Sequence, residues 1–396
     1  MYVERHIKLR RQYFFGNSSS SLLALLVATL VFTASNAYAV FGERITVSGT
    51  QFKAGAQRIW INGANTPWKA WNDFGGKFDA AWWTNHFQAL HDNSINDTRV
   101  WITCSGEVGI DISANGVVTG ATAAHWADLD TLFQIARSKG VYIMATLISC
   151  DHTTGGRSNH LKWRAMLSSG SNVDSYVSNY VIPFVNRYKD NPFLWSIDLC
   201  NEPDWIIEEA RRGQLSWDVM QVYFAKAAVA IHENSDILVT VGIAMGPKYN
   251  SPRLGQGNKV SDAALQAKVN SPAARLDFWS PHHYDWQTKI WGNPFNMTPV
   301  AYGLDGSKPA LIGECPSGGT AGQTVAQDYE NDFVNGWQGA QGWTSNGVDS
   351  NGGLAELAPA TNAFKNNHGA LVYHSAGVPA APIGQAAPAG NPPRSP

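Results

Sequence analysis

Eight short apolar segments that alternate with amphipathic ones predict an α/β fold, a single closed (β/α)8 TIM barrel, over residues 40–375. The apolar segments are rich in β-branched and aromatic residues, and most end at Gly, Asn, Ser or Pro, which indicates strands buried on both faces. An open doubly wound sheet is the competing architecture. It usually carries a Gly-rich phosphate loop after its first strand, and NGANTPW (residues 62–68) is no such loop.

The eight predicted strands are segments 57–64, 97–104, 140–149, 193–202, 237–245, 276–284, 309–315 and 339–345. Between them, four apolar stripes at helical spacing predict helices that pack on the strands. The stripes are Trp83, Phe87 and Leu90; Trp126, Leu129, Phe133 and Ala136; Tyr176, Tyr180 and Phe184; and Val325, Tyr329, Phe333 and Trp337. Gly140 predicts the end of the second helix. The helix after the fifth strand has no clear limits in the sequence.

The two ends of the chain differ from the middle in composition. Residues 1–39 combine a basic start, an apolar run at 21–33 and small residues up to Ala39, which predicts a secretory signal peptide cut after Ala39. An uncleaved membrane anchor is the alternative. We therefore expect a secreted protein, extracellular or periplasmic. Residues 376–396 are rich in Pro, Ala and Gly without apolar periodicity, which predicts a disordered tail or a linker.

The charge balance argues against two classes of partner. Removal of residues 1–39 leaves 25 Lys and Arg against 30 Asp and Glu, with no block of basic residues. Nucleic acid and anionic membrane surfaces are therefore not expected partners, and no membrane span should remain after cleavage. We expect the protein to be a monomer.

Two glutamates stand at the ends of predicted strands. Glu202 ends the fourth strand and Glu314 the seventh, and each is followed by a proline within two residues. The carboxyl ends of barrel strands meet at one mouth, and the fourth and seventh strands lie on roughly opposite sides of it. Two facing carboxyl groups about 5 Å apart are what a retaining glycosidase needs. The alternative is that both are ordinary buried ion-pair partners, with Arg99 as one candidate cation.

The motifs DLCNEPDW, SPHHYDW and PALIGECP, in this order, resemble glycoside hydrolase family 5, a family of retaining (β/α)8 glycosidases that includes cellulases and β-mannanases. The resemblance covers roughly residues 45–370. It implies that Glu202 is the acid/base and Glu314 the nucleophile, that Arg99 restrains the nucleophile, and that Asn201 binds the sugar 2-hydroxyl. It also implies places in the substrate site for the following residues: His282, Tyr284 and Trp343.

One departure from the family concerns the third strand. Many cellulases of the family end this strand with a histidine that lines the subsite, whereas ATLISCDH places the nearest one, His152, in the following loop. Mannan is therefore favoured over glucan. We interpret His152 and His160 as solvent-exposed loop residues, and we expect neither a metal nor another cofactor.

The sixteen tryptophans suit a cleft for sugars, because sugar rings stack on aromatic planes. Those on helical stripes are expected in the core. Those in predicted loops are candidates for the substrate site, and they are Trp68, Trp71, Trp101, Trp205, Trp286 and Trp291.

The four cysteines, Cys104, Cys150, Cys200 and Cys315, match no zinc-ligand spacing. Free thiols and a disulfide are both compatible with the sequence. A Cys104–Cys150 bridge is the preferred pairing because these residues end neighbouring strands.

These observations predict a secreted retaining endo-β-1,4-glycan hydrolase that acts by double displacement on a β-linked polysaccharide or oligosaccharide. An exo-β-glycosidase of the same family and a non-catalytic carbohydrate-binding barrel are the alternatives. We expect the charged form of Glu314 to be favoured by Arg99 and a tyrosine, and the pKa of Glu202 to be raised by apolar neighbours and a second anion.

Overall fold

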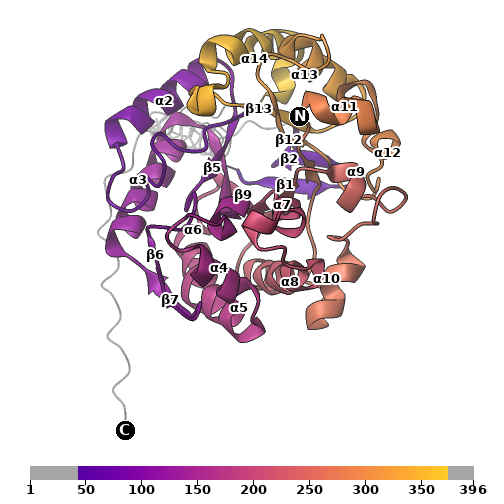
Figure 1. Ribbon diagram of the computed structural model, residues 1–396. Helices are drawn as coiled ribbons and strands as arrows, with labels where there is room; N and C mark the ends of the chain where they lie inside the picture. The colour runs from indigo at the N-terminus through magenta and orange to yellow at the C-terminus, as the bar shows by residue number, and fades with distance from the viewer. Residues whose placement is uncertain (1–42, 373–396) are drawn as a thin grey trace, which may run out of the picture. The chain divides into compact units, whose positions relative to one another are not determined.

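The computed structural model describes residues 43–372 (Figure 1). The predicted signal peptide (1–39) and the Pro-rich tail (376–396) lie outside these residues. Within them, eight parallel strands form the predicted barrel, in the order β11-β10-β9-β8-β5-β4-β13-β12. The strands are β4 (Ile61–Asn65), β5 (Asp97–Trp101), β8 (Tyr142–Ser149), β9 (Leu194–Asn201), β10 (Leu238–Ile243), β11 (Ser280–Pro281), β12 (Ile312–Pro316) and β13 (Gly339–Trp343). Each falls within or overlaps one of the predicted segments.

The barrel closes between β11 and β12, which are joined by isolated bridges and not by a continuous pairing of strands. β11 has only two residues, but single bridges on either side of it join Trp279 to Ala310 and His282 to Glu314. The backbone N–H of Leu311 donates to the carbonyl of Trp279 at 3.0 Å, and that of His283 donates to Glu314 at 2.9 Å. Closure therefore brings the segment that follows β11 directly alongside Glu314.

The helices surround the strands (Figure 1). They are α2 (Ala80–Asp92), α3 (Ala123–Lys139), α4 (His160–Leu167), α5 (Gly170–Tyr176), α6 (Ile182–Tyr188), α7 (Pro203–Glu208), α8 (Trp217–Asn234), α9 (Gly246–Tyr249), α10 (Asp262–Val269), α11 (Asp285–Trp291), α12 (Pro299–Tyr302), α13 (Val325–Val334) and α14 (Leu354–His368). Short 3-10 or π turns occur at Cys150–Thr153 (η1), Val177–Val181 (η2), Ala210–Arg212 (η3), Pro294–Asn296 (η4), Val348–Ser350 (η5) and Gly369–Leu371 (η6). None of the helices within residues 43–372 combines the length and apolarity that crossing a lipid bilayer requires.

The predicted apolar stripes account for most of the helix packing. The first stripe is fully buried on α2, and α3 ends at Gly140, whose left-handed φ of 67° suits glycine. The third stripe runs through α5, a π turn at Val177–Val181 and α6 as one helical stretch. The fourth prediction is wrong at its end. Trp337 lies beyond α13, because Gly336 adopts a φ of 90° and the chain turns into β13 there.

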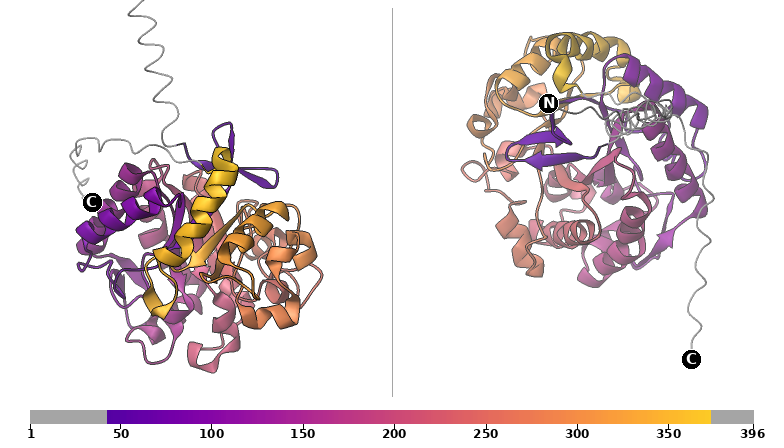
Figure 2. Two further views of the ribbon diagram at one scale, coloured as in Figure 1. Left: turned by 90° about the horizontal axis from the view of Figure 1, so that it is seen from above. Right: turned by 180° about the vertical axis from the view of Figure 1, so that it is seen from behind.

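A small antiparallel sheet covers the end of the barrel opposite the strand carboxyl ends. It consists of β1 (Ile45–Ser48), β2 (Gln51–Ala54) and β3 (Gln57–Ile59), and it faces the viewer in the right panel of Figure 2. Phe52 from β2 is fully buried and meets Trp195 and Phe278 edge-on, each with ring centroids 5.2 Å apart. These three aromatic side chains keep water out of the end of the barrel that the small sheet covers. A second short hairpin, β6 (Ile110–Ile112) with β7 (Val118–Ala121), lies in the loop after β5.

Two buried carboxyl groups on α13 destabilise the fold by an amount that depends on pH. Asp328 and Asp332 are one helical turn apart, both are fully buried, and no described residue donates a hydrogen bond of normal geometry to either. Burial raises the pKa of Asp328 to about 7, which nearby Thr320 only partly offsets. Burial and the charge of Asp328 raise the pKa of Asp332 well above its usual value. Both groups therefore favour the protonated form in the folded chain.

We expect Asp332→Asn to stabilise the protein more at pH 8 than at pH 5. As the pH rises above about 4, an aspartate in the unfolded chain loses its proton while Asp332 keeps it, so wild-type stability falls. The asparagine removes this dependence. The free energy of unfolding of the variant, relative to wild type, should increase by about 1 kcal/mol or more between these pH values.

Urea denaturation at both pH values measures this difference. Asp92→Asn, which removes a carboxylate from the exposed face of α2, is the matched control. A variant-minus-wild-type difference that stays constant from pH 5 to pH 8 would contradict the assignment of a raised pKa to Asp332.

Candidate active site

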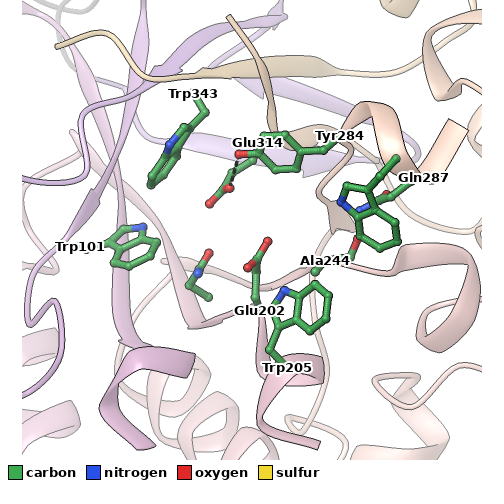
Figure 3. Close-up of a pocket in the computed structure, with 10 residues that line it drawn as sticks. Trp101, Glu202, Trp205, Ala244, Tyr284, Gln287, Glu314 and Trp343 are labelled. Atoms are coloured by element: carbon green, nitrogen blue, oxygen red, sulfur yellow. Dashed lines mark hydrogen bonds between the residues drawn. The ribbon is translucent and has the colours of Figure 1, made fainter. Parts of the chain in front are cut away.

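The two predicted glutamates face each other across the mouth of the barrel (Figure 3). Glu202 follows β9 directly and precedes α7, whose first residue is Pro203. Its backbone is left-handed, with φ 51° and ψ 55°, and its N–H donates to the carbonyl of Gly242 at 2.7 Å. Glu314 lies within β12 and is 3% exposed. The strand therefore stops at Glu202 and the turn directs its carboxyl group into the mouth.

The separation of the two carboxyl groups suits direct attack on a bond between them. One carboxylate oxygen of Glu202, one of Glu314 and a ring nitrogen of His282 all lie within 4.8 Å of one another. The Nδ1 of His282 is 3.1 Å from Oε1 of Glu202 and 3.5 Å from Oε2 of Glu314. Retaining glycosidases hold their carboxyl pair about 5–5.5 Å apart, whereas inverting ones leave roughly 6.5–9.5 Å for a water molecule.

Arg99, from β5, is the fully buried cation beside Glu314. Its Nη1 donates to Oε1 of Glu314 at 2.7 Å and to Oδ1 of Asn65 at 3.1 Å. Its Nε and Nη2 both donate to Oδ2 of Asp198, at 3.0 and 2.6 Å. Burial alone would lower the pKa of Arg99, but the charges of Asp198 and Glu314 outweigh it and raise the pKa. Because Arg99 has no exposed surface, it holds Glu314 and does not contact substrate.

Asn201 and Tyr284 complete the contacts of this group. Nη2 of Arg99 donates to Oδ1 of Asn201 at 2.7 Å, which directs the amide NH2 of Asn201 away from the guanidinium. The hydroxyl of Tyr284 donates to Oε2 of Glu314 at 2.8 Å. Asn201 and Tyr284 both line the cavity, as the sequence predicts for residues that meet the substrate.

A cavity of about 290 Å³ lies between the glutamates. Its aromatic walls are formed by Trp101, Trp205, Trp286 and Trp343, with Tyr284 beside them. A second hollow lies beside it and shares Tyr284, Trp286 and Trp343 with it. Its other lining residues include Ser317, Asn351 and Glu356.

Three predicted substrate-site residues lie behind the cavity wall. Trp68 is only 6% exposed and packs edge-on against Trp101 and Trp343, with ring centroids 5.1 and 6.0 Å apart. It supports the two tryptophans that line the cavity and does not line it itself. Trp291 similarly packs behind Trp286 at 6.1 Å. His282 is fully buried and reaches the cavity only through the two carboxyl groups.

Burial dominates the electrostatics of both glutamates. It raises the pKa of Glu202 to about 7, although the charges of Arg99 and Arg212 oppose the shift. Burial also raises the pKa of Glu314, with His282, Arg99 and the Tyr284 hydrogen bond opposing it and Glu202 adding to it. The prediction for Glu202 is confirmed. The expectation that the charged form of Glu314 is simply favoured is wrong, because desolvation and a second carboxyl group outweigh its donors.

The hydrogen bonds nevertheless distinguish the two carboxyl groups. Glu314 accepts from both Arg99 and Tyr284, and each of these donors favours its ionised form. Glu202 has the His282 contact and a hydrogen bond from Trp205, but no cation or tyrosine donates to it directly among the described residues. Burial lowers the pKa of His282 to about 4, so this ring is neutral at neutral pH. When the pair holds one proton, it therefore resides on Glu202.

Glu202, His282 and Glu314 are also the one group of the described residues whose atoms are spaced to hold a metal ion. The guanidinium of Arg99 lies 2.7 Å from Glu314 and would repel a cation placed there. The same three residues serve acid–base chemistry without such repulsion. The arrangement therefore favours a carboxyl pair over a metal centre.

The predicted Cys104–Cys150 disulfide is wrong. All four cysteines are buried free thiols. Cys104 belongs to the tryptophan cluster with Trp68, Trp101 and Trp343, whereas Cys150 belongs to the main hydrophobic core. Neighbouring strand ends thus direct these two side chains into different layers. His152 is also not an exposed loop residue, because it is fully buried with its Nε2 3.0 Å from the hydroxyl of Thr103.

The sequence prediction missed three residues of the site. Asp198 holds Arg99 from inside β9, Asn65 holds it from β4, and Gln287 lines the cavity from α11. Asp198 had a signal, since a charged residue within the apolar run SIDLC needs a buried partner. Asn65 and Gln287 are ordinary polar residues at the ends of elements and had no such signal.

The backbone of Glu202 gives a prediction about stability. We expect Glu202→Gly to be more stable than Glu202→Ala by about 1 kcal/mol, because only glycine adopts a φ near +51° without strain. Both variants lack the carboxyl group, so the comparison isolates the backbone. Thermal or urea unfolding measures it.

The control is the same pair of changes at Asn85, which is exposed in the middle of α2. There the order should reverse, with alanine more stable by about 1 kcal/mol. Equal stability of the two Glu202 variants would show that the left-handed backbone relaxes without cost.

The chain is similar to known proteins over most of its length. It is 26% identical over 347 residues to a mannan endo-1,4-β-mannosidase of Cryptopygus antarcticus, which covers 80% of this chain and 88% of the relative. It is 26% identical over 339 residues to a mannan endo-1,4-β-mannosidase of Mytilus edulis, which covers 78% and 90%. No family model matches the chain.

Solved structures share the fold. The β-1,4-D-mannanase of Cryptopygus antarcticus superposes with a TM-score of 0.73 at 24% identity, covering 82% of this chain and 94% of that one. The endo-1,4-β-mannanase of Eisenia fetida superposes with a TM-score of 0.72 at 21% identity, covering 81% and 95%. With the motifs around Glu202 and Glu314 in place at the mouth of this barrel, the chain resembles glycoside hydrolase family 5, and the relatives and structures with which it aligns are β-mannanases.

Proposed function

We propose that this protein is an endo-β-1,4-mannanase that cleaves mannan with retention of anomeric configuration. The observation that carries the proposal is the carboxyl pair, whose oxygens approach within 4.8 Å at the mouth of the barrel. The choice of mannan rests on the relatives, which are named as mannan endo-1,4-β-mannosidases and align with about four fifths of the chain.

In the first step, Glu314 attacks the anomeric carbon while Glu202 donates its proton to the leaving glycosidic oxygen. A covalent glycosyl–Glu314 ester forms and the shortened chain leaves with the proton. Arg99 and Tyr284 hold one oxygen each of Glu314, which orients the carboxylate before attack. As Glu314 becomes a neutral ester, the negative charge beside Glu202 disappears and the pKa of Glu202 falls.

In the second step, the same Glu202 accepts a proton from water, and the resulting hydroxide equivalent attacks the anomeric carbon and releases Glu314. A pKa of about 7 lets Glu202 act as an acid in the first step and as a base in the second. The amide of Asn201 faces the cavity where a sugar 2-hydroxyl would lie, and this contact strengthens in the transition state.

The cleft supports endo action on a polymer. The second hollow adjoins the cavity at Trp286 and Trp343, which supports binding of sugars beyond the one at the carboxyl pair. An exo-glycosidase needs a cavity closed on one side. A non-catalytic binding barrel has no need for two carboxyl groups held face to face by Arg99, Tyr284 and His282.

We also propose that the protein is secreted, with cleavage after Ala39, and that it acts as a monomer. Residues 1–39 support secretion by their composition. Every side chain of the described site comes from a single chain. N-terminal sequencing of the exported protein and its elution volume in gel filtration test these two points.

The substrate preference is tested on a panel of mannan, carboxymethyl-cellulose and xylan. We expect the highest rate on mannan and a fall in viscosity that precedes the release of most reducing ends, since endo cleavage shortens chains early. Proton NMR of the first products should show the β-anomer before mutarotation. An initial α-anomer would contradict the retaining mechanism.

The roles of the two glutamates are separated by their variants and by the leaving group. We expect Glu202→Gln to lower kcat/KM on mannan about 10²–10⁴-fold, because the leaving sugar needs a proton. On an aryl β-mannoside with a dinitrophenolate leaving group, which needs no proton, the same variant should keep kcat/KM within about tenfold of wild type. Glu314→Gln should lose activity on both substrates, because no ester can form. Equal losses for Glu202→Gln on both substrates would overturn its role as the acid.

A further inference from the structure

Asp204, two residues after Glu202, is fully buried and holds the neighbouring strand end. It lies in the first turn of α7, and its two oxygens accept from consecutive backbone N–H groups. Oδ1 accepts from Ala244 at 3.1 Å and Oδ2 accepts from Met245 at 2.7 Å. Both donors belong to the segment directly after β10. A carboxylate with one oxygen on each of two N–H groups fixes this segment in position and orientation.

The segment held by Asp204 is part of the cavity wall. Ala244 lines the cavity, and its carbonyl accepts from Nε2 of Gln287 at 2.7 Å. Gln287 lies in α11, which begins directly after Tyr284, the donor to Glu314. Asp204 therefore begins a continuous chain of contacts from the turn of Glu202, along one wall of the cavity, to the residue that orients Glu314. The backbone of Glu202 is tied to β10 a second time through the carbonyl of Gly242.

The charge of Asp204 acts on Glu202 as well. Burial raises the pKa of Asp204 to about 7, the charge of Glu202 adds to this, and the bonds from Met245 and Ala244 oppose it. Two carboxyl groups this close titrate as a pair, and each disfavours ionisation of the other. Asp204 accepts two backbone N–H groups, which favour its ionised form, whereas the charges of Arg99 and Arg212 and a hydrogen bond from Trp205 favour the ionised form of Glu202. Because each negative charge opposes the other, the pair keeps its last proton to higher pH than either carboxyl group would alone.

The other charged and titratable groups around Glu202 come from six elements. Arg99 and Arg212 lower the pKa of Glu202 and Asp151 raises it. The set comprises Arg99 on β5, Cys150 and Asp151 on η1, Cys200 on β9, Arg212 on η3, His282 and Tyr284 after β11, and Glu314 on β12. None of them changes in a variant of Asp204, so such a variant reports the contribution of Asp204 alone.

We infer that Asp204 is a positioning residue for the general acid: it holds the wall beside Glu202 through Ala244 and Met245, and its carboxyl group, next to that of Glu202, lets the pair keep one proton to higher pH. This inference rests on the proposed function, since it assigns a role to a neighbour of the acid. Asp204 contacts neither the cavity nor the substrate, so it acts through Glu202 and the wall.

Asp204→Asn tests the inference, because it keeps the size and one acceptor oxygen and removes the charge. The basic limb of the pH profile of kcat/KM on mannan should move to lower pH by about 0.5–1 unit. At pH 5 the variant should lose about tenfold in kcat, because one N–H loses its acceptor, with KM within about twofold. On the dinitrophenyl mannoside the basic limb should not move, because that substrate needs no acid.

Asp332→Asn is the matched control, since it also removes a fully buried carboxyl group but lies on α13 away from the cavity. The basic limb of the pH profile of kcat/KM for this control should coincide with that of wild type. An Asp204→Asn profile that falls equally at every pH, or one identical to wild type, would overturn the inference. Carbon-13 NMR of the carboxyl groups in the wild-type enzyme gives a second measurement, independent of folding of the variants. The carboxyl signals of Asp204 and Glu202 should each follow two titration steps, because the two groups are coupled, and two independent single-step titrations would also overturn the inference.

These outcomes are separate from failure of the proposed function. An inactive wild-type enzyme on every β-glycan would remove the proposed function. If the wild-type enzyme is active and the pH profile of Asp204→Asn coincides with that of wild type, only the role of Asp204 is contradicted.

Discussion

The buried guanidinium of Arg99 is the constraint on which the site depends. Complete burial of a cation costs more free energy than the rest of a fold can offset, unless its N–H groups are paired with acceptors. Here the pairing groups come from three strands: Asp198 and Asn201 from β9, Asn65 from β4 and Glu314 from β12. The need to pair one cation thus orients Glu314 and Asn201 together. Asp198 and Glu314 already exceed the charge of Arg99, so a third anion at Glu202 is unfavourable and Glu202 keeps a proton.

The closed barrel makes this pairing possible. Parallel strands bring residues far apart in the chain to one mouth, and Arg99 and Glu314 are 215 positions apart. The short strand β11 both closes the barrel and positions residues of the site. The bridge between His282 and Glu314 aligns the segment after β11 with β12, and this alignment places Tyr284 on Glu314 and His282 between the two carboxyl groups. The site therefore requires the contacts between β11 and β12 that close the barrel.

The aromatic residues divide between the cavity wall and the layer behind it. Trp101 and Trp343 line the cavity, and Trp68 packs behind both and fixes their planes. Such support matters because sugar stacking requires rings that do not rotate away from the cleft. The same principle places Asp204 behind Glu202, where it holds Ala244 and Met245 without reaching the cavity. In both cases the residues that meet substrate are held by buried neighbours whose importance only the packing reveals.

The sequence by itself determined the barrel and the two glutamates that face each other at its mouth. Strand-length apolar runs ending at Glu202 and Glu314 follow from local rules of burial and from the way proline ends a strand, and the family motifs repeat that pattern. The sequence did not determine that all four cysteines are free thiols, where α13 ends relative to Trp337, or which tryptophans line the cavity. It also gave no reliable order of ionisation for Glu202 and Glu314. These properties depend on distances between distant segments and on desolvation at the closed mouth, so only the tertiary structure decided them.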